Sequence, residues 1–208
     1  MSDSELTLRK FVNAIADGEE AAAFDMLASS PQLAKASFNA GATRQAVNEY
    51  FLDRIKRYVV EGDTALHIAA AAYQTELVRS LIRAGADVQA GNRFGDQPLH
   101  AAAVGAPGSH LWNPQAQAET IICLIEAGAD PNTADKRGVT PLHKAVRTRC
   151  ASAVRALLEH GADPARKNKS GSTAMVLATH NTGRGGTGSP EAREQQREIV
   201  RLLEQGSS

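Results

Sequence analysis

Three histidines in the middle of the chain close motifs of the same form, Gly-x-x-x-Leu-His. They are His67, His100 and His143. Imidazole nitrogens bind zinc and act as general acids and bases, so a row of histidines is a candidate for a metal or catalytic site. Zinc holds its ligands about 2 Å from one centre, whereas equivalent residues of successive motif copies point in parallel and lie apart. We therefore predict a structural role for these histidines and no metal site.

Two other patterns contain residue types used in catalysis. Gly183 to Gly188 matches the G-x-G-x-x-G dinucleotide fingerprint, but that fingerprint needs a preceding strand in a βαβ unit, and a helical pattern precedes it here. Ser189-Pro190 stands where a P-loop requires Lys-Ser/Thr. Cys150 could form a nucleophile triad with His143 and Asp163, supported by composition alone. We predict no catalytic residue and no cofactor, and keep a nucleotide-dependent enzyme using the Gly183–Gly188 loop as the less favoured alternative.

The motifs that contain the histidines belong to an internal repeat. Glycines begin the front motif at positions 62, 95, 138 and 171, so the spacings are 33, 43 and 33 residues. In each of the first three repeats, this front motif is followed by a second motif, the back motif. The back motif ends in Gly-Ala-Asp, with its glycine at position 85, 128 or 161. Because the second spacing is ten residues longer, we place an insertion at 106–115.

Each repeat contains the signals of two short antiparallel helices. The first helix is predicted to start after an N-cap threonine, which accepts a hydrogen bond from a free backbone N–H: Thr64, Thr140 and Thr173. Pro98 and Pro141 suit the first helical position. The second helix is predicted to end at a left-handed glycine: Gly85, Gly128, Gly161 and Gly206. One helix pair cannot bury its apolar face alone, so neighbouring repeats must stack and share a core.

These residues resemble the ankyrin-repeat family. Thr-Pro-Leu-His and Gly-Ala-Asp at a period of 33 residues form its signature, complete between Thr140 and Asp163 and recognisable over about 60–180. The resemblance implies an all-α ankyrin solenoid with short β-hairpin fingers at 92–95, 135–138 and 168–171. It also implies that each histidine hydrogen-bonds to the threonine of its own motif and to the next repeat. Gln97 stands in the threonine position of the His100 motif, which therefore matches this role only in part.

The whole chain, 1–208, is predicted to form one ankyrin-repeat domain with divergent ends. A degenerate helix pair at 4–28 is expected to close the N-terminal end, and an extra helix at 43–59 to follow it, with an apolar stripe of Val47, Tyr50, Phe51, Ile55 and Tyr58. The first finger is doubtful because Val59 replaces its Asp or Asn. The predicted segments are 4–59 for the N-terminal cap and extra helix, 60–94, 95–137 and 138–170 for the repeats, and 171–206 for the C-terminal capping repeat with its loop at 181–190.

Composition limits the classes of function. The chain has 23 Lys+Arg, 23 Asp+Glu and 42% hydrophobic residues, which excludes a disordered tail or a collagen-like protein and gives no overall basic excess for nucleic acid. One segment departs from neutrality. Residues 135–169 contain nine basic and three acidic side chains, a net charge of +6. This segment is either a solvated surface or a binding surface for an acidic protein partner; a nucleic-acid binder using 136–169 is the alternative.

The sequence also predicts the environment of the protein. The acidic N-terminus lacks the basic region of a secretory signal, and charges interrupt every apolar run before a membrane span is reached. Two cysteines, Cys123 and Cys150, are too few for a disulfide framework and fit a reduced compartment. We predict a cytoplasmic protein without a membrane segment, and a monomer because polar caps close both ends of the stack.

The function implied by the resemblance is non-enzymatic protein binding through the concave face of fingers and inner helices. Phe94 is expected either to anchor a partner or to fold onto the neighbouring finger. Trp112, the single tryptophan, is expected either to cover a helix end or to contact a partner. The predicted contact residues are Arg93, Phe94, Asp96, Lys136, Arg137, Val139, Arg147, Lys169 and Trp112.

Overall fold

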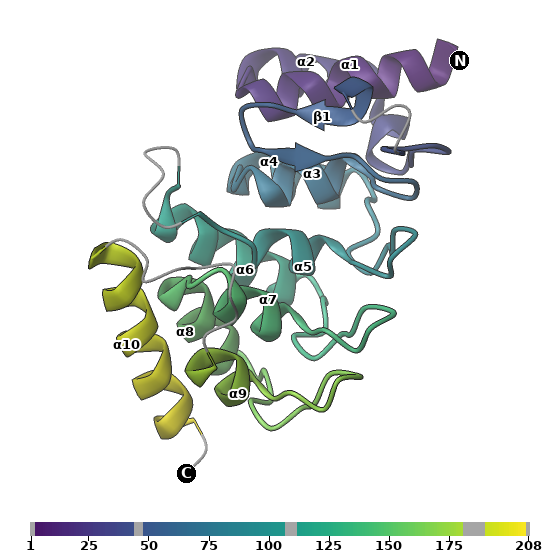
Figure 1. The fold of residues 1–208 in the computed structure, drawn as a ribbon. Coiled ribbons are helices and arrows are strands. Elements are labelled where there is room, and N and C mark those ends of the chain that lie inside the picture. Colours follow the sequence, from purple (N-terminus) through teal and green to yellow (C-terminus); the bar gives the residue numbers. More distant parts are fainter. Residues whose placement is uncertain (1–2, 44–47, 107–111, 181–189, 207–208) are drawn as a thin grey trace.

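The computed structural model describes residues 3–43, 48–106, 112–180 and 190–206 (Figure 1). The N-terminal cap consists of α1 (Asp3–Asp17), α2 (Glu20–Ser29) and the 3-10 turn η1 (Pro31–Ala34). A short turn η2 (Asn48–Tyr50) and two strands, β1 (Phe51–Leu52) and β2 (Arg57–Tyr58), precede the first repeat. The helix pairs that follow are α3 (Ala65–Ala71) with α4 (Thr75–Arg83), α5 (Pro98–Ala102) with α6 (Pro114–Glu126), α7 (Pro141–Arg147) with α8 (Ala151–Glu159), and α9 (Ala174–Thr179) with α10 (Pro190–Gln205).

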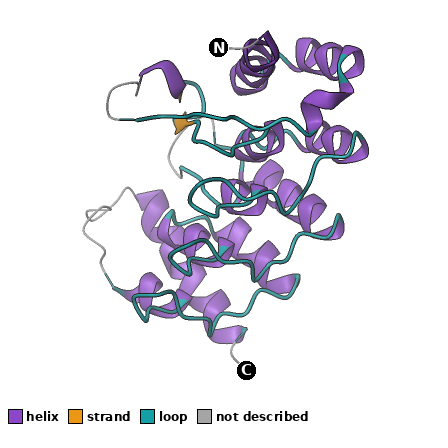
Figure 2. Cartoon of the chain, turned by 90° about the vertical axis from the view of Figure 1, so that its right-hand side faces the viewer, coloured by secondary structure: helices purple, strands orange, loops and turns teal. Residues whose placement is uncertain are grey.

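The pairs stack into two helical layers, as the repeat pattern predicts. In the inner layer, α1 packs on α3, α3 on α5, α5 on α7 and α7 on α9; in the outer layer, α2, α4, α6, α8 and α10 pack in the same order. Figure 2 shows the fingers projecting toward the viewer, in front of these layers. The fold is therefore the all-α ankyrin solenoid expected from the sequence.

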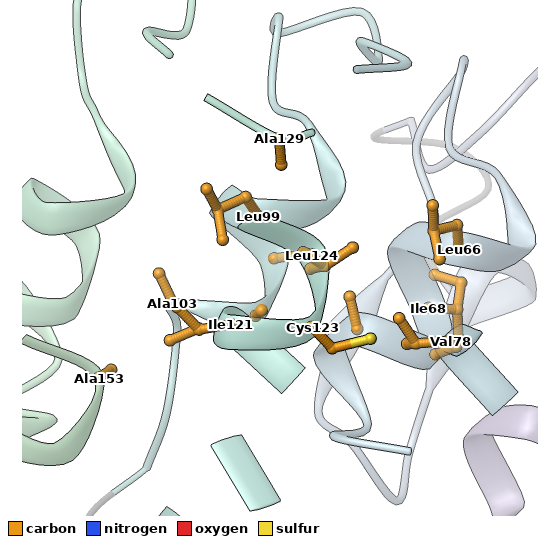
Figure 3. Packing of buried hydrophobic residues seen from close by; sticks show 14 of the residues in the cluster. Leu66, Ile68, Val78, Leu99, Ala103, Ile121, Cys123, Leu124, Ala129 and Ala153 are labelled. Atoms are coloured by element: carbon orange, nitrogen blue, oxygen red, sulfur yellow. The ribbon is translucent and has the colours of Figure 1, made fainter. Parts of the chain in front are cut away.

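The core is continuous from repeat to repeat because each interface is filled by small aliphatic side chains. Leu66, Leu99 and Leu142 occupy the same place in successive inner helices, and each is at most 1% exposed. Figure 3 shows Cys123 of α6 facing Val78 of the preceding repeat. The scarcity of aromatic residues, 4% of the chain, is explained by this close spacing of helices.

The three histidines of the repeat motifs connect each repeat to the next. In each of the three motifs, Nδ1 accepts the backbone N–H of the N-cap residue, Thr64, Gln97 or Thr140, at 3.1–3.2 Å. Nε2 lies 3.0 Å from a backbone carbonyl oxygen of the following finger, which assigns the ring proton to Nε2. The structural role predicted for the three histidines is confirmed. Thr64 Oγ1 and Thr140 Oγ1 also lie 3.0 and 2.8 Å from Nδ1, whereas Gln97 contacts Nδ1 through its backbone N–H, so the His100 motif matches the role in part, as predicted.

Helix ends follow the sequence signals with one exception. Thr64, Thr140 and Thr173 are the N-cap residues of α3, α7 and α9. The glycines at positions 85, 128 and 161 are left-handed, with φ of +90°, +98° and +90°. Gly206 is not among the left-handed glycines, so the prediction for that position is wrong: its N–H donates to Leu202 O at 3.0 Å, which continues the helical hydrogen bonding of α10.

Both predicted caps form. The stripe of Leu8, Phe11, Val12 and Ile15 is buried on α1, and the turn at Asp17-Gly18 leads into α2. At the other end Ile199, Leu202 and Leu203 bury the inner face of α10. The loop at 181–189 lies outside the described residues. Among the described helices none is long and apolar enough to cross a bilayer.

The extra helix predicted at 43–59 is wrong. Within the described part of this segment the chain forms the antiparallel pair β1–β2, with Phe51 opposite Tyr58 and their rings 4.7 Å apart. Lys56 is left-handed, with φ of +48°, which turns the chain back. Val47, the first residue of the predicted stripe, lies outside the described residues. We call the segment 48–58 the insertion hairpin: it is extended at 51–52 and 57–58, and it contacts the rest of the fold on two sides.

Some of those contacts are apolar: Leu52 is buried in the core, and Tyr50 and Ile55 pack against it. The polar contacts reach both neighbours of the insertion hairpin. On the α1 side, Arg54 donates to the carbonyl oxygen of Asp17. On the side of the first repeat, Arg57 Nη2 lies 3.2 Å from Oδ1 of the fully buried Asp63, which also accepts from Asn92 Nδ2 at 2.9 Å. Burial alone would raise the pKa of Asp63, but the charge of Arg57 and these hydrogen bonds hold it below its usual value. Asp63 therefore stays ionised and fixes the hairpin to the stack.

The first finger is replaced by pairing between two distant segments. Phe38 N–H donates to Asp63 O at 2.9 Å and Gly62 N–H donates to Phe38 O at 2.8 Å. Gly41 permits this pairing, because a Cβ there would lie 2.5 Å from the backbone of Val60. The expectation that this finger would differ is confirmed: Gly62 N–H donates to Phe38 O, whereas the glycine of a complete finger donates to the residue three positions before it.

Candidate binding face

Each finger is a tight turn held by the side chain of its first residue. Oδ1 of Asn92, Asp135 and Asn168 accepts the backbone N–H groups two and four residues further on, at 2.8–3.1 Å. The glycines that close the turns are left-handed, with φ between +74° and +79°. A short polar side chain and a glycine three residues later therefore determine the shape of every finger, as the sequence predicts.

The fingers are also bonded to one another. Arg93 N–H donates to Glu61 O at 2.8 Å, Lys136 N–H to Phe94 O at 2.9 Å, and Lys169 N–H to Arg137 O at 2.9 Å. One backbone hydrogen bond thus joins each finger to the one before it. We call the row formed by 92–95, 135–138 and 168–171 the finger ridge. Its tips are held in fixed relative positions before any partner binds.

Phe94 is exposed at the tip of the first complete finger. Its side chain is 47% exposed, and the guanidinium of Arg93 lies 4.8 Å from the ring centroid. Arg93 is itself held by a hydrogen bond from Nη2 to Ala42 O at 2.9 Å. Of the two conformations considered for Phe94, the structure has the exposed one.

The other finger tips carry exposed cations. Lys136, Arg137 and Lys169 all have exposed side chains. Lys136 Nζ donates to Arg93 O at 2.7 Å, and Arg137 Nη2 lies 3.3 Å from Asp135 Oδ2. These contacts orient the cations along the finger ridge and leave them open to solvent.

Three further predicted contact residues have different environments. Val139 is only 5% exposed, so its inclusion is corrected: its N–H donates to Asp135 and its carbonyl oxygen accepts from His100, and these bonds hold the residue in a buried position. Asp96 Oδ1 lies 2.6 Å from Lys144 Nζ, and this ion pair neutralises its charge. Arg147 is exposed in the last turn of α7.

Trp112 covers the junction between α5 and α6. Its indole Nε1 donates to Gln117 Oε1 at 2.8 Å, while Gln117 Nε2 donates to Ala102 O at 2.9 Å. The ring is partly buried against the core, which agrees with the covering role considered for it. Residues 107–111 of the insertion lie outside the described residues.

An open groove of about 1230 Å³ lies at the N-terminal half of this face. Its walls come from the insertion hairpin, the first complete finger, the C-terminal ends of α3 and α5, and the Trp112 loop. Four predicted contact residues, Arg93, Phe94, Asp96 and Trp112, line it; Lys136, Arg137, Arg147 and Lys169 do not. Sequence reasoning did not place Arg54, Tyr58, Tyr73 and Val104 at a site, and they also line the groove.

The basic segment 136–169 does not form one continuous cationic surface. Lys144 is paired with Asp96 on the inner layer, and Arg155 with Glu198 of α10 at 2.5 Å on the outer layer. The net charge of +6 that the sequence gives residues 135–169 is thus divided between two faces. This distribution weakens the case for a nucleic-acid surface, which needs cations gathered on one side.

The candidate catalytic residues have no shared site. His143 contacts Thr140 and Ser172, whereas Cys150 Sγ contacts Thr148. Burial raises the pKa of the Cys150 thiol to about 11, so it remains protonated at neutral pH. The described residues contain no group of His, Cys, Asp or Glu side chains arranged to hold a metal ion. The Gly183–Gly188 loop lies outside the described residues, and the helix α9 precedes it where a dinucleotide site needs a strand.

Comparison with known proteins agrees with this architecture. Two family models match, one described as ankyrin repeats (3 copies) over 28–111 and one as ankyrin repeats (many copies) over 124–178. Protein phosphatase 1 regulatory subunit 12A of Mus musculus, and that of Rattus norvegicus, are each 45% identical to this chain over 60 residues. That match covers 29% of this chain and 6% of either relative. With the matched models spanning more than half of the chain, the protein belongs to the ankyrin-repeat family.

Proposed function

We propose that this protein is a non-enzymatic module that binds a protein partner through its finger ridge and inner helices. Ankyrin repeats are general protein–protein interaction modules. The observation that carries the proposal is the rigid row of exposed side chains on the ridge, from Phe94 through Lys136 and Arg137 to Lys169. A surface that is already ordered loses little conformational entropy on binding.

The charge on the ridge favours an acidic partner surface. Lys136, Arg137 and Lys169 lie on consecutive fingers, and within the described residues Asp135 is the one carboxylate that pairs with them. Cations aligned in this way accelerate association with an acidic partner and weaken as salt screens them. Binding of such a partner is therefore expected to slow as ionic strength rises.

The relatives support a binding role of the same kind. The matched relatives are named as regulatory subunits of a phosphatase, and a regulatory subunit acts by contacting other proteins. The chain spans 6% of their length. The similarity therefore supports protein binding by the repeats and does not identify a particular partner. The two free cysteines are buried, which fits the cytoplasmic, monomeric protein that we propose.

Affinity capture from cells that make the protein tests this proposal. Three forms of the chain are compared: wild type, a ridge variant with Lys136→Ala, Arg137→Ala and Lys169→Ala, and a control with Lys10→Ala, Arg193→Ala and Arg201→Ala. The control removes the same charge from exposed positions on the cap helices. Nuclease treatment before capture removes contacts bridged by nucleic acid.

The expected result is a protein retained by the wild type and the control and lost by the ridge variant. If all three forms retain the same proteins, the finger ridge is not the binding face. If nuclease releases everything that the wild type retains, the nucleic-acid alternative takes its place.

A further inference from the structure

Exposed apolar side chains gather on the N-terminal groove. The large hydrophobic residues that are exposed in the described part of the chain are Leu6, Tyr58, Phe94, Val104 and Val176. Tyr58, Phe94 and Val104 all line the groove, at 45%, 47% and 39% exposed. Clustered exposure of this kind marks a binding surface, whereas the two remaining residues are isolated.

The groove is built from the two places where the chain departs from an ordinary repeat. The insertion hairpin supplies Tyr58, and the lengthened connection between α5 and α6 supplies Val104 and Trp112. Figure 2 shows that the hairpin lies at one side of the stacked fingers, next to the first of them. Tyr73 braces the opposite wall, because its hydroxyl donates to Val104 O. Both walls are therefore fixed by contacts within the chain.

Most of the charges along the groove are neutralised internally. Lys56 pairs with Asp53 at 2.8 Å, and Lys144 with Asp96 at 2.6 Å. Arg57 pairs with the buried Asp63. Each of these charged side chains therefore already has a partner of opposite charge within the chain.

Arg54 and Arg93 differ from the paired charges. Both donate to backbone carbonyl oxygens, those of Asp17 and Ala42, and neither has a carboxylate within 4.0 Å in the described part of the chain. Arg54 lies on the hairpin wall and Arg93 on the finger wall, so two cations border the apolar lining of Tyr58 and Phe94. Glu20 is the remaining acidic residue of the lining once Asp96 is paired.

We propose that the groove binds a segment of a protein partner in which an aromatic or large aliphatic side chain is flanked by Asp or Glu. The apolar side chain would lie against Tyr58, Phe94 and Val104, and the flanking carboxylates would pair with Arg54 and Arg93. The volume of about 1230 Å³ exceeds the ~300–1,000 Å³ of most small-molecule pockets, which favours a peptide segment. This inference rests on the proposed function and assigns a chemical class to the partner.

Selection from a displayed library of random 12-residue peptides tests the inference on the full chain. Enriched peptides are synthesised and titrated against wild type, against a groove variant with Tyr58→Ser, Phe94→Ser and Val104→Ser, and against a control with Leu6→Ser and Val176→Ser. They are also titrated against the ridge variant defined above. The control removes exposed apolar side chains outside the groove. Each peptide is also made with its Asp and Glu replaced by Lys and titrated against wild type, a comparison that does not depend on how the groove variant folds.

The expected result is enrichment of peptides with a large apolar residue between acids. Their affinity should fall about tenfold or more in the groove variant and in the Lys-substituted peptides, and stay unchanged in the control. Enriched peptides that are basic or uncharged, or that keep their affinity for the groove variant, overturn the inference. If those peptides lose affinity for the ridge variant instead, protein binding by the ridge stands without the groove. If wild type enriches nothing, both proposals lose their support.

Discussion

Lowering the pH from 7.5 to 5.5 is expected to destabilise the protein through His100. The ring is fully buried, Nδ1 accepts from Gln97 N–H, and Nε2 donates to Val139 O, so the folded state holds the neutral ring. Burial, reinforced by the charge of Lys144, lowers the pKa of His100 from 6.5 to about 4. The unfolded chain binds the proton more readily, and the stability contributed by the neutral ring is lost as the pH falls from above 6.5 toward 4.

The magnitude follows from the two pKa values. A shift of this size corresponds to about 3 kcal/mol once the pH is below both values, at 1.36 kcal/mol per pKa unit. At pH 5.5 the unfolded ring is mostly protonated and the folded ring is not, so the loss relative to pH 7.5 is about 1 kcal/mol. Burial also lowers the pKa of His67 and His143, which adds to the effect in the same direction.

Urea unfolding at both pH values, followed by circular dichroism and by the fluorescence of the single tryptophan, measures this loss. The variant His100→Gln cannot take up the proton, so its free energy of unfolding should fall by about 1 kcal/mol less than that of wild type between pH 7.5 and 5.5. His180→Gln, at an exposed position, is the control and should behave as wild type. Equal pH dependence of wild type and His100→Gln would refute the argument.

Three further predictions concern single positions. Gly41→Ala places a Cβ 2.5 Å from the backbone of Val60 and should lower the free energy of unfolding by about 1–3 kcal/mol, whereas Gly91→Ala, with its nearest contact at 3.8 Å, should leave it unchanged; equal melting temperatures would contradict this. Thr140→Ala removes the N-cap of α7 and should cost about 1 kcal/mol in urea unfolding, so no change would show that the cap is dispensable. Cys150, with a pKa of about 11, should resist iodoacetamide at pH 8 until urea unfolds the chain, and rapid labelling of the native protein by mass spectrometry would disprove its burial.

Local interactions explain why the repeats could be predicted from sequence. In the motif from Thr140 to His143 the threonine caps the helix and the histidine bonds to the threonine backbone, so four consecutive residues contain most of the geometry. The insertion hairpin could not be predicted in this way. Tyr50, Phe51 and Tyr58 recur at a spacing that suits a helix, but long-range contacts such as Arg54 with Asp17 decide the structure. Spacing alone contains no information about those contacts.

In the candidate site, too, the features that depend on local interactions could be predicted and those that depend on long-range contacts could not. The exposed finger tips were predicted because a finger depends on one Asn or Asp and one glycine close by in sequence. Val139 was wrongly predicted to be a contact residue. Its burial depends on backbone hydrogen bonds to Asp135 and His100, and His100 is distant in sequence. The groove was missed because its walls come from positions as far apart as Ala16 and Ala116, and the resemblance to ordinary repeats does not include the two insertions that form it.

The bonding between fingers has a consequence for changes in chain length. Each finger donates the same backbone N–H to the segment before it, and the fingers at 92–95 and 135–138 offer the same carbonyl oxygen to the finger after them. Excision of 136–168, one period of 33 residues, would bring Lys169 N–H to the acceptor Phe94 O that Lys136 now uses, and Ser172 O to the position of Val139 O beside His100. The hydrogen bonds between fingers therefore do not depend on the number of repeats. A gene encoding this protein can gain or lose a whole repeat and keep the same bonds at the new junction.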